Sequence, residues 1–288
     1  MNILVVGGTR FFGLPMVRKL TENGHAVTIA TRGGHSDPFG DSVRRVIMDK
    51  TDTDSVKAAL GGEQFDLLID KVAYSSNDVI SLLSGARCKR YIQMSSCAVY
   101  ETAHTDIGES EFCAKDIALV RMDRTGDYAL GKRQAERAAL EMLDESACTF
   151  VRYPVVLGEN DYTGRLRAYV KAVACGTPMN IKNPDAKTAY IFEDEAGGFI
   201  AHLADTEISG AVNGCAVGTV SQSDIIGYIE HRCGKKAVFS QGGEKMPYDD
   251  TASDTSYSCA RAKGTGFVFG ELTGRLYALL EDEIDKLR

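Results

Sequence analysis

The first 150 residues alternate short apolar runs with amphipathic stretches. Segments that read as buried strands lie at residues 3–6, 26–31, 43–48, 65–70, 89–94 and 148–153. Between them, residues 13–23, 52–60, 76–83 and 127–144 have the composition and spacing of helices. This alternation predicts an α/β fold built on a doubly wound parallel sheet with right-handed crossovers.

A glycine-rich turn joins the first expected strand to the first helix. Gly7 and Gly8 follow the strand directly, and Gly13 opens the helix. Without a Cβ, the backbone N–H groups can approach a ligand, and a helix N-terminus favours a diphosphate. The dinucleotide fingerprint has glycines at its first, fourth and seventh positions, which here are Gly7, Arg10 and Gly13, so the match is imperfect. Its place between strand and helix still predicts a Rossmann-type dinucleotide site.

The end of the second strand carries no carboxylate. An NAD-selective site would place an acid there to accept from both ribose hydroxyls. This chain has Thr31 and Arg32, with Arg10 in the nearby glycine turn. Guanidinium groups suit a 2′-phosphate, so we expect NADP. NAD stays possible if both arginines are solvated surface residues or if Asp37 supplies the missing acid.

The regular alternation loosens after about residue 156. Helices are expected over 166–175, 223–232 and 271–287, and the segment near 190–204 is expected to return to the sheet. We therefore expect a dinucleotide-binding Rossmann domain over residues 1–155. Residues 156–288 would form mainly a smaller, C-terminal substrate-binding lobe.

Composition narrows the function classes. The 288 residues carry a formal net charge of −7, which disfavours a general nucleic-acid surface. No apolar run reaches membrane-span length, the first strand begins too early for a signal peptide, and the histidines show no metal-ligand spacing. The eight cysteines are scattered without a Cys-x-x-Cys pair. We expect a cytoplasmic protein with reduced thiols, no membrane segment and no metal.

Candidate chemistry follows the fifth strand. Ligands bind doubly wound sheets beyond the carboxyl ends of the strands, which places Ser96 at the active edge. Tyr128 and Lys132 lie four positions apart on the next long helix and share one face. Tyr-x-x-x-Lys alone is common and predicts little. Together with the glycine turn and Ser96, it follows the order that a hydride-transfer site needs.

These features resemble the short-chain dehydrogenase/reductase superfamily, especially its extended branch of NAD-dependent epimerases and dehydratases. The Gly-Gly-x-x-x-x-Gly spacing is similar to an atypical subgroup that includes reductases and messenger-RNA-binding proteins. The matching segments are residues 7–13, the Ser-Ser-x-x-Val-Tyr run ending at Tyr100, Tyr128 with Lys132, and residues 152–158.

The resemblance implies a role for each residue of the trio. Tyr128 would be the general acid/base, and Ser96 would hydrogen-bond the reacting oxygen. Lys132 would lower the pKa of the Tyr128 phenol and hold the nicotinamide ribose. Cys97 would be a buried thiol, since no histidine is placed to activate it. A homodimer is a further family expectation.

The expected cofactor contacts gather at the glycine turn and just after the second, third, fourth and sixth strands. They are Gly7, Gly8, Thr9, Arg10, Phe11, Phe12, Gly13, Arg32, Asp49, Lys50, Val72, Ala73, Lys132, Tyr153, Pro154 and Val156.

One departure from the family pattern affects the substrate. Sugar-nucleotide epimerases of the extended branch place an arginine two residues before the tyrosine matched by Tyr190, where this chain has Thr188 beside Lys187. The later segment 246–254 is acidic and lacks an arginine pair, so a substrate diphosphate would find little neutralising charge. We therefore expect an NAD(P)-dependent oxidoreductase that acts on an unidentified small hydroxyl or carbonyl substrate. Nucleotide-sugar epimerase or dehydratase is the first alternative, and a non-catalytic, cofactor-bound RNA-associated or regulatory protein is the second.

Overall fold

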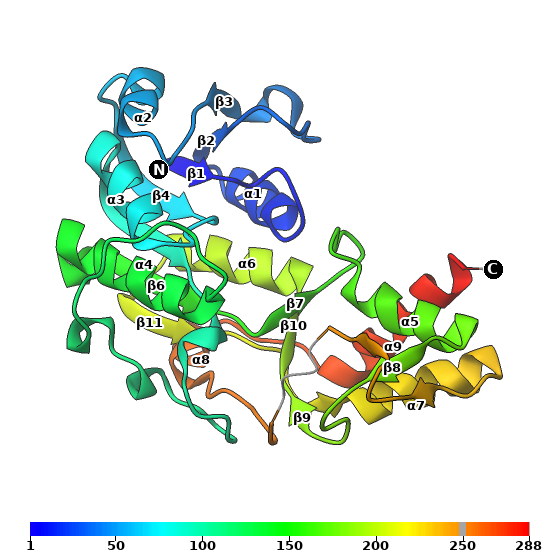
Figure 1. Cartoon of the computed structure of the whole chain (residues 1–288). Helices are drawn as coiled ribbons and strands as arrows, with labels where there is room; N and C mark the ends of the chain where they lie inside the picture. The colour runs from blue at the N-terminus through cyan, green and yellow to red at the C-terminus, as the bar shows by residue number, and fades with distance from the viewer. Residues whose placement is uncertain (248–251, 288) are drawn as a thin grey trace.

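A seven-stranded parallel sheet forms the larger of two lobes (Figure 1), in a computed structural model that describes residues 1–247 and 252–287. The strand order is β11-β6-β5-β4-β1-β2-β3, and every neighbouring pair is parallel. Successive strands are added on one side of β1 up to β3 and on the other side from β4 onward. This reversal of strand order between β1 and β4 confirms the doubly wound Rossmann-type sheet. The strands are β1 (Asn2–Val6), β2 (Ala26–Thr31), β3 (Arg44–Ile47), β4 (Gln64–Asp70), β5 (Arg87–Met94), β6 (Cys148–Arg152) and β11 (Gly210–Asn213).

Helices cover both faces of this sheet. α1 (Gly13–Glu22) and α6 (Glu193–Ala204) pack together on one face, and α2 (Thr53–Leu60), α3 (Ser76–Gly85) and α4 (Tyr128–Met142) cover the other. Capping fixes where two of them begin, because the Asp52 side chain accepts from the Asp54 N–H and Ser75 accepts from the Asp78 N–H.

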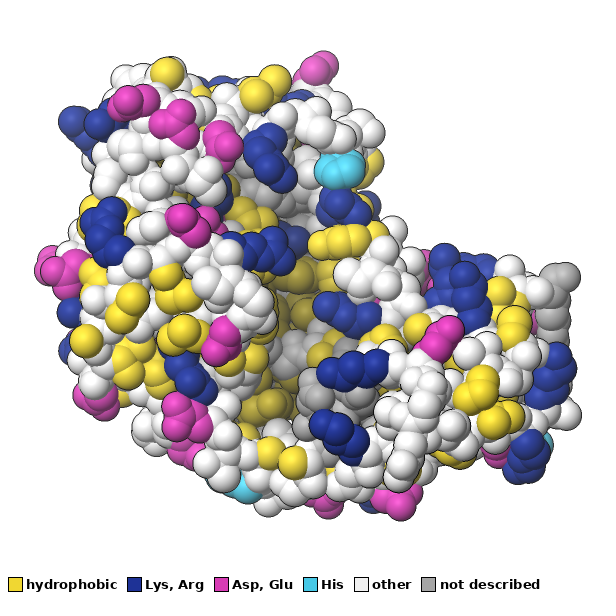
Figure 2. All heavy atoms as spheres, viewed as in Figure 1, with side chains coloured by type: hydrophobic (Ala, Val, Ile, Leu, Met, Phe, Trp, Pro, Cys, Tyr) yellow, Lys and Arg dark blue, Asp and Glu magenta, His cyan; other side chains and the backbone are white. Residues whose placement is uncertain are grey.

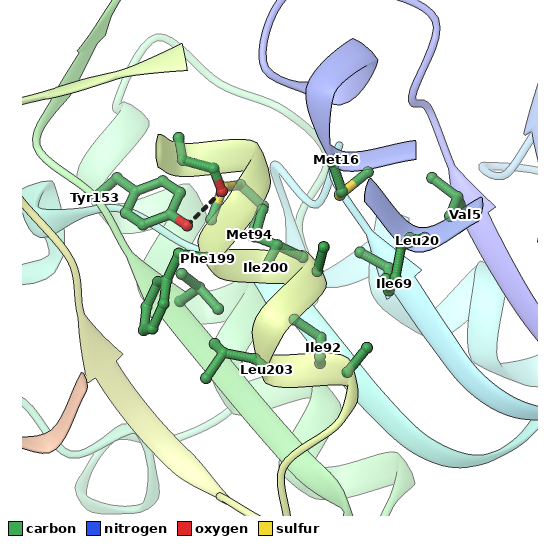
Figure 3. Close-up of a cluster of buried hydrophobic side chains, with 14 of the residues drawn as sticks. Val5, Met16, Leu20, Ile69, Ile92, Met94, Tyr153, Phe199, Ile200 and Leu203 are labelled. Carbon is green, nitrogen blue, oxygen red and sulfur yellow. Dashed lines mark hydrogen bonds between the residues drawn. The ribbon is translucent and has the colours of Figure 1, made fainter. Parts of the chain in front are cut away.

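The core beneath α1 and α6 is almost entirely aliphatic (Figure 3). Val5, Ile69 and Ile92 rise from three strands of the sheet to meet Leu20 of α1 and Ile200 of α6. All five side chains are buried, so this layer contributes much of the hydrophobic stabilisation of the nucleotide lobe.

Residues 190–204 do not add a strand to the main sheet. Tyr190–Phe192 forms β10, which pairs with β7 (Val155–Leu157) outside it, and the segment then becomes α6. A Cβ on Gly197 would lie 2.6 Å from the Phe12 carbonyl oxygen, so glycine permits the close contact between α6 and α1. The strand that extends the sheet is β11, which the hydrophobic pattern did not reveal because it has only four residues.

The smaller lobe packs three helices over short strands. The helices are α5 (Arg165–Cys175), α7 (Gln222–Cys233) and α9 (Leu272–Asp285), and α8 (Ala260–Gly264) lies against β11. The strands are β8 (Pro178–Asn180), β9 (Lys187–Thr188), β12 (Val220–Ser221), β13 (Val238–Phe239) and β14 (Glu244–Lys245). Short 3-10 turns occupy Gly40–Ser42, Cys97–Val99, Glu109–Glu111, Ala114–Asp116 and Glu145–Ala147. Within residues 1–247 and 252–287, no helix combines the length and apolarity needed to cross a membrane.

A buried polar network ties α4 to the sheet. The Arg152 guanidinium, at the end of β6, donates to both carboxylate oxygens of Glu136 on α4, at 2.9 and 2.7 Å. The Ser95 hydroxyl donates to the same carboxylate. Arg152 also donates to the Tyr100 hydroxyl, which donates to Asn213 on β11 at 2.6 Å. Because Arg152 and Glu136 are both buried, neither charge can be solvated instead.

Replacing Arg152 with Met would leave the Glu136 carboxylate buried without its partner. We expect the free energy of unfolding to fall by about 3–5 kcal/mol, measured by urea denaturation. The control is Lys89→Met, which breaks the exposed ion pair with Asp66 and should cost less than about 1 kcal/mol. Equal losses in the two variants would contradict the structural role of Arg152.

Candidate active site

The glycine turn presents free donors at the start of α1. Gly7 and Gly8 have φ angles of 96° and 99°, which side-chain-bearing residues rarely adopt. A Cβ on Gly13 would lie 2.7 Å from the Gly8 Cα, so the helix can begin only because this residue is glycine. Among the described residues, the N–H groups of Phe11 and Phe12 have no protein acceptor. A dinucleotide diphosphate therefore fits this turn.

Phe11 itself has a φ of 54°, an unfavourable conformation for a bulky residue. Its ring is held edge-on to Phe12 and to Tyr162, with centroid separations of 5.5 and 6.4 Å. Backbone strain of this kind is concentrated at ligand-binding sites, which agrees with the place of this turn in the cleft.

Two cations lie beside the turn. The Arg10 guanidinium lies 3.6 Å from the Tyr162 ring centroid, and the Lys71 ammonium lies 4.1 Å from that of Phe12. Burial and the neighbouring Arg10 lower the pKa of Lys71 to about 8. Neither cation forms an ion pair within the described residues, so both are available to an anionic ligand.

The end of β2 places Arg32 on the surface, where its charge helps to lower the pKa of Asp49. The Asp37 carboxylate is held by Arg45 at 2.6 and 2.9 Å, and this contact lowers the pKa of Asp37. Asp37 is therefore engaged with β3 and does not supply the missing acid.

Two further candidate cofactor residues are occupied within the protein. Asp49 accepts from the Thr51 hydroxyl at 2.7 Å. Lys50 is buried, and its ammonium donates to both carboxylate oxygens of Asp70, at 3.0 and 2.7 Å, and to the Val72 carbonyl. The Lys50 ammonium thus links β4 to the segment that follows it, and a contact between Lys50 and the cofactor stays a prediction.

Ser96, Tyr128 and Lys132 come together at the carboxyl edge of the sheet. Ser96 follows β5, and it lines the same cavity as Tyr128, where its hydroxyl acts to lower the pKa of the Tyr128 phenol. Tyr128 is the first residue of α4, whose N-cap Asp127 accepts from the Leu130 N–H. The Lys132 ammonium lies one turn further along, 5.6 Å from the Tyr128 ring centroid.

Lys132 is fixed by backbone carbonyls. Its ammonium donates to the carbonyl oxygens of Ala73 and Met94, both at 2.7 Å, which leaves one N–H free for a ligand. Burial lowers the pKa of Lys132 to about 7. Although 47% of the Tyr128 residue surface is exposed, its hydroxyl lies in the cleft, where burial raises the phenol pKa and Ser96 opposes that rise. The pKa of Tyr128 is therefore raised by burial, against the expectation that Lys132 lowers it.

The trio opens into a cavity of about 720 Å³ between the two lobes. Figure 2 shows Lys and Arg side chains on both sides of this hollow. Tyr153, Pro154 and Val156 line it, as the sequence predicts. The lining residues that sequence reasoning missed include Lys71, Tyr74, Arg124, Arg165 and Tyr257.

Some of these residues could have been predicted from their place in the sequence just after a strand. Lys71 and Tyr74 directly follow β4 and flank Val72 and Ala73, so the strand-end rule covers them. Arg165 comes from the smaller lobe, and no local motif marks it. Because the Arg165 guanidinium lines the cavity, the cleft contains positive charge that could neutralise an anionic substrate, contrary to the expectation from the sequence. The segment 246–254, which carried part of that expectation, includes residues 248–251, which lie outside the described residues.

Sequence comparison identifies related proteins. Residues 3–79 and 67–184 match the family model named NAD dependent epimerase/dehydratase family. The chain is 36% identical over 113 residues to the chloroplast stem-loop binding protein of 41 kDa b of Arabidopsis thaliana, covering 34% of this chain and 30% of that protein. It is 28% identical over 210 residues to the 2′-dehydrokanamycin reductase of Streptomyces kanamyceticus, covering 70% and 58%. The chain thus spans less than two thirds of either relative.

Structural comparison finds UDP-sugar epimerases. A UDP-glucose 4-epimerase from Thermotoga maritima, solved with UDP-glucose, matches with a TM-score of 0.73 and 16% identity, covering 100% of this chain and 99% of that one. A UDP-glucuronic acid 4-epimerase from Bacillus cereus, solved with UDP-glucuronic acid and NAD, has the same two values and covers 100% of both chains. At these identities the likeness establishes the fold.

Proposed function

Because the chain belongs to the NAD dependent epimerase/dehydratase family and is an NAD-dependent enzyme of the short-chain dehydrogenase/reductase type, we propose that it is a reductase or dehydrogenase of a small hydroxyl- or carbonyl-bearing molecule. The observation that supports this most directly is that Ser96, Tyr128 and Lys132 line one cavity, with the Lys132 ammonium 5.6 Å from the Tyr128 ring centroid. The Streptomyces relative, a reductase by name, favours net reduction.

The geometry gives each side chain a task. The turn formed by Gly7, Gly8 and Gly13 would hold a nicotinamide cofactor, which would supply or accept the hydride at the reacting carbon. In reduction, Ser96 holds the carbonyl oxygen and Tyr128 gives it a proton, so that carbonyl becomes alcohol. Lys132 uses its remaining N–H to hold the cofactor ribose. Its positive charge stabilises the phenolate that the Tyr128 side chain becomes after it has given up its proton. In oxidation, Tyr128 takes the proton back.

We further propose a preference for NADP over NAD. Arg32 is exposed at the end of β2, the Arg10 guanidinium lies 3.2 Å from His35 in the following loop, and Asp37 is engaged by Arg45. The 2′-phosphate would therefore meet the positive charge of Arg10 and Arg32, while the Asp37 carboxylate is already paired with Arg45. Structural neighbours bind NAD, so the choice rests on this loop alone.

Epimerisation is the second candidate, because the structural neighbours are epimerases and because the cleft is more cationic than the sequence suggested. Cofactor stoichiometry separates the two. A reductase oxidises one NADPH for each product molecule, whereas an epimerase regenerates its cofactor in every turnover. A panel of keto sugars and UDP-sugars, assayed for both NADPH consumption and product, decides between them.

Tyr128→Phe removes the proposed proton donor while keeping the ring. We expect turnover to fall by at least about 100-fold, with NADPH affinity within about twofold of wild type. Steady-state kinetics and NADPH fluorescence titration measure the two quantities. Tyr277→Phe, in the far lobe, is the control and should keep full turnover. Undiminished activity in Tyr128→Phe would remove this residue from the mechanism.

Cofactor choice gives a separate prediction. Wild-type protein should bind NADPH about tenfold or more tighter than NADH, since a charged hydrogen bond contributes about 1.5–3 kcal/mol. Arg32→Glu should narrow or invert this ratio, whereas Arg87→Glu, at the opposite end of the sheet, should leave it unchanged. Equal affinities in the wild type would count against the 2′-phosphate argument.

The lowered pKa of Lys71 leads us to expect that the affinity for NADH depends on pH. The pKa of Lys71 is about 8 in the free protein, and a bound diphosphate favours the ammonium form. Above pH 8, binding must take up a proton, so NADH affinity should fall as pH rises and stay level just below pH 8. NADH is used because it lacks the titrating 2′-phosphate.

Lys71→Met should weaken NADH binding at pH 7 and abolish that decline. Arg10→Met is the matched control, because arginine stays charged throughout the range. That variant should keep the decline and move it to higher pH, since Arg10 lowers the Lys71 pKa. An unchanged pH profile in Lys71→Met would exclude Lys71 from the diphosphate site.

A further inference from the structure

Two arginines in the cleft have no task in the proposed chemistry. Arg124 lies in the loop before α4, and its guanidinium is 4.4 Å from the Tyr74 ring centroid. The Lys132 ammonium lies 4.7 Å from the same ring. Tyr74 therefore adjoins both the catalytic lysine and Arg124. Within the described residues, the Arg124 guanidinium makes no hydrogen bond or ion pair.

Arg165 approaches from the smaller lobe, at the start of α5. Its nearest acidic neighbour is Asp161, one helical turn away, and the two side chains are separated by 3.9 Å. That distance is too long for a hydrogen bond and leaves most of the donors of the guanidinium free. Both Arg124 and Arg165 line the same cavity as Tyr128, and their charges oppose the rise that burial causes in the pKa of its phenol.

The cavity as a whole concentrates positive charge. Lys71, Arg124, Lys132 and Arg165 line it, and none of its lining residues in the described part of the chain is acidic. The protein as a whole carries a net charge of −7, so the positive charge of the cavity is opposite in sign to the net charge of the protein. Cations gathered in a cleft attract anions and raise their local concentration.

The cofactor accounts for only part of this charge. Arg10 and Lys71 adjoin the glycine turn, where the diphosphate fits, and Arg32 adjoins the ribose selector. Arg124 and Arg165 instead flank the trio, on the loop before α4 and on α5. Planar guanidinium groups are well suited to grip a carboxylate or phosphate through paired hydrogen bonds.

We propose that Arg124 and Arg165 bind an anionic group of the substrate, a carboxylate or a phosphate, held close to the carbon whose oxygen meets Ser96 and Tyr128. This inference rests on the proposed function for the position of that oxygen. A neutral analogue would leave both guanidinium groups without a partner, so the site should select against it.

The test uses the full chain saturated with NADP. Calorimetric titration with inorganic phosphate and with acetate probes the anion site without knowledge of the substrate. Arg124→Gln and Arg165→Gln should each weaken binding of the better probe by at least about fivefold, with NADP affinity unchanged. The matched control is Arg121→Gln, an exposed arginine in the same loop that does not line the cavity, and it should bind as wild type does.

A second arm identifies the anion. Tighter binding of glucose 6-phosphate than of glucose supports a phosphate-bearing substrate, and tighter binding of glucuronate than of glucose supports a carboxylate-bearing one. Equal binding of all three sugars, or anion binding unaffected by both variants, would overturn the proposal. Anion binding that disappears when NADP is added would also overturn it, because the arginines would then serve the cofactor. Failure to bind NADP at all would instead contradict the proposed function.

Discussion

The buried ion pair between Arg152 and Glu136 sets the geometry on which the rest of the site depends. It joins the end of β6 to the middle of α4, and Ser95 adds the end of β5 through its hydrogen bond to the same carboxylate. Ser96 follows directly, and Tyr128 and Lys132 lie on α4 itself. A shift of α4 along the sheet would therefore break a buried charge pair before it separated the trio.

The close approach of α4 also determines the chemistry of Lys132. A Cβ on Gly131 would lie 2.4 Å from the Tyr74 carbonyl oxygen, so this glycine lets the helix contact the backbone after β4. Because α4 lies so close to this backbone, the Lys132 ammonium is buried and donates hydrogen bonds to the carbonyl oxygens of Ala73 and Met94. Burial lowers the pKa of Lys132 to about 7. Burial in this packing therefore lowers the pKa of Lys132 even though the carboxylates of Asp70 and Glu136 act to raise it.

Sequence reasoning reached the elements with strong local signals. The parallel sheet and the trio followed from continuous aliphatic strands and from residues placed at strand ends, and the structure places Ser96 and Tyr128 in one cavity. It missed β11, which is too short to show a pattern, and it did not foresee the buried Lys50–Asp70 pair, which has no sequence signature. Arg165 could not be foreseen, since its approach depends on how the lobes pack.

That packing explains how one fold can serve different substrates. The nucleotide lobe supplies the glycine turn, Ser96, Tyr128 and Lys132, to which the proposed function assigns the hydride and proton transfers at a carbon–oxygen bond. The smaller lobe supplies Arg165, and with it one wall of the cavity. Across the cleft, Tyr162 of that lobe lies over the Arg10 guanidinium at the glycine turn. A ligand that contacts both walls of the cavity therefore meets positive charge from both lobes.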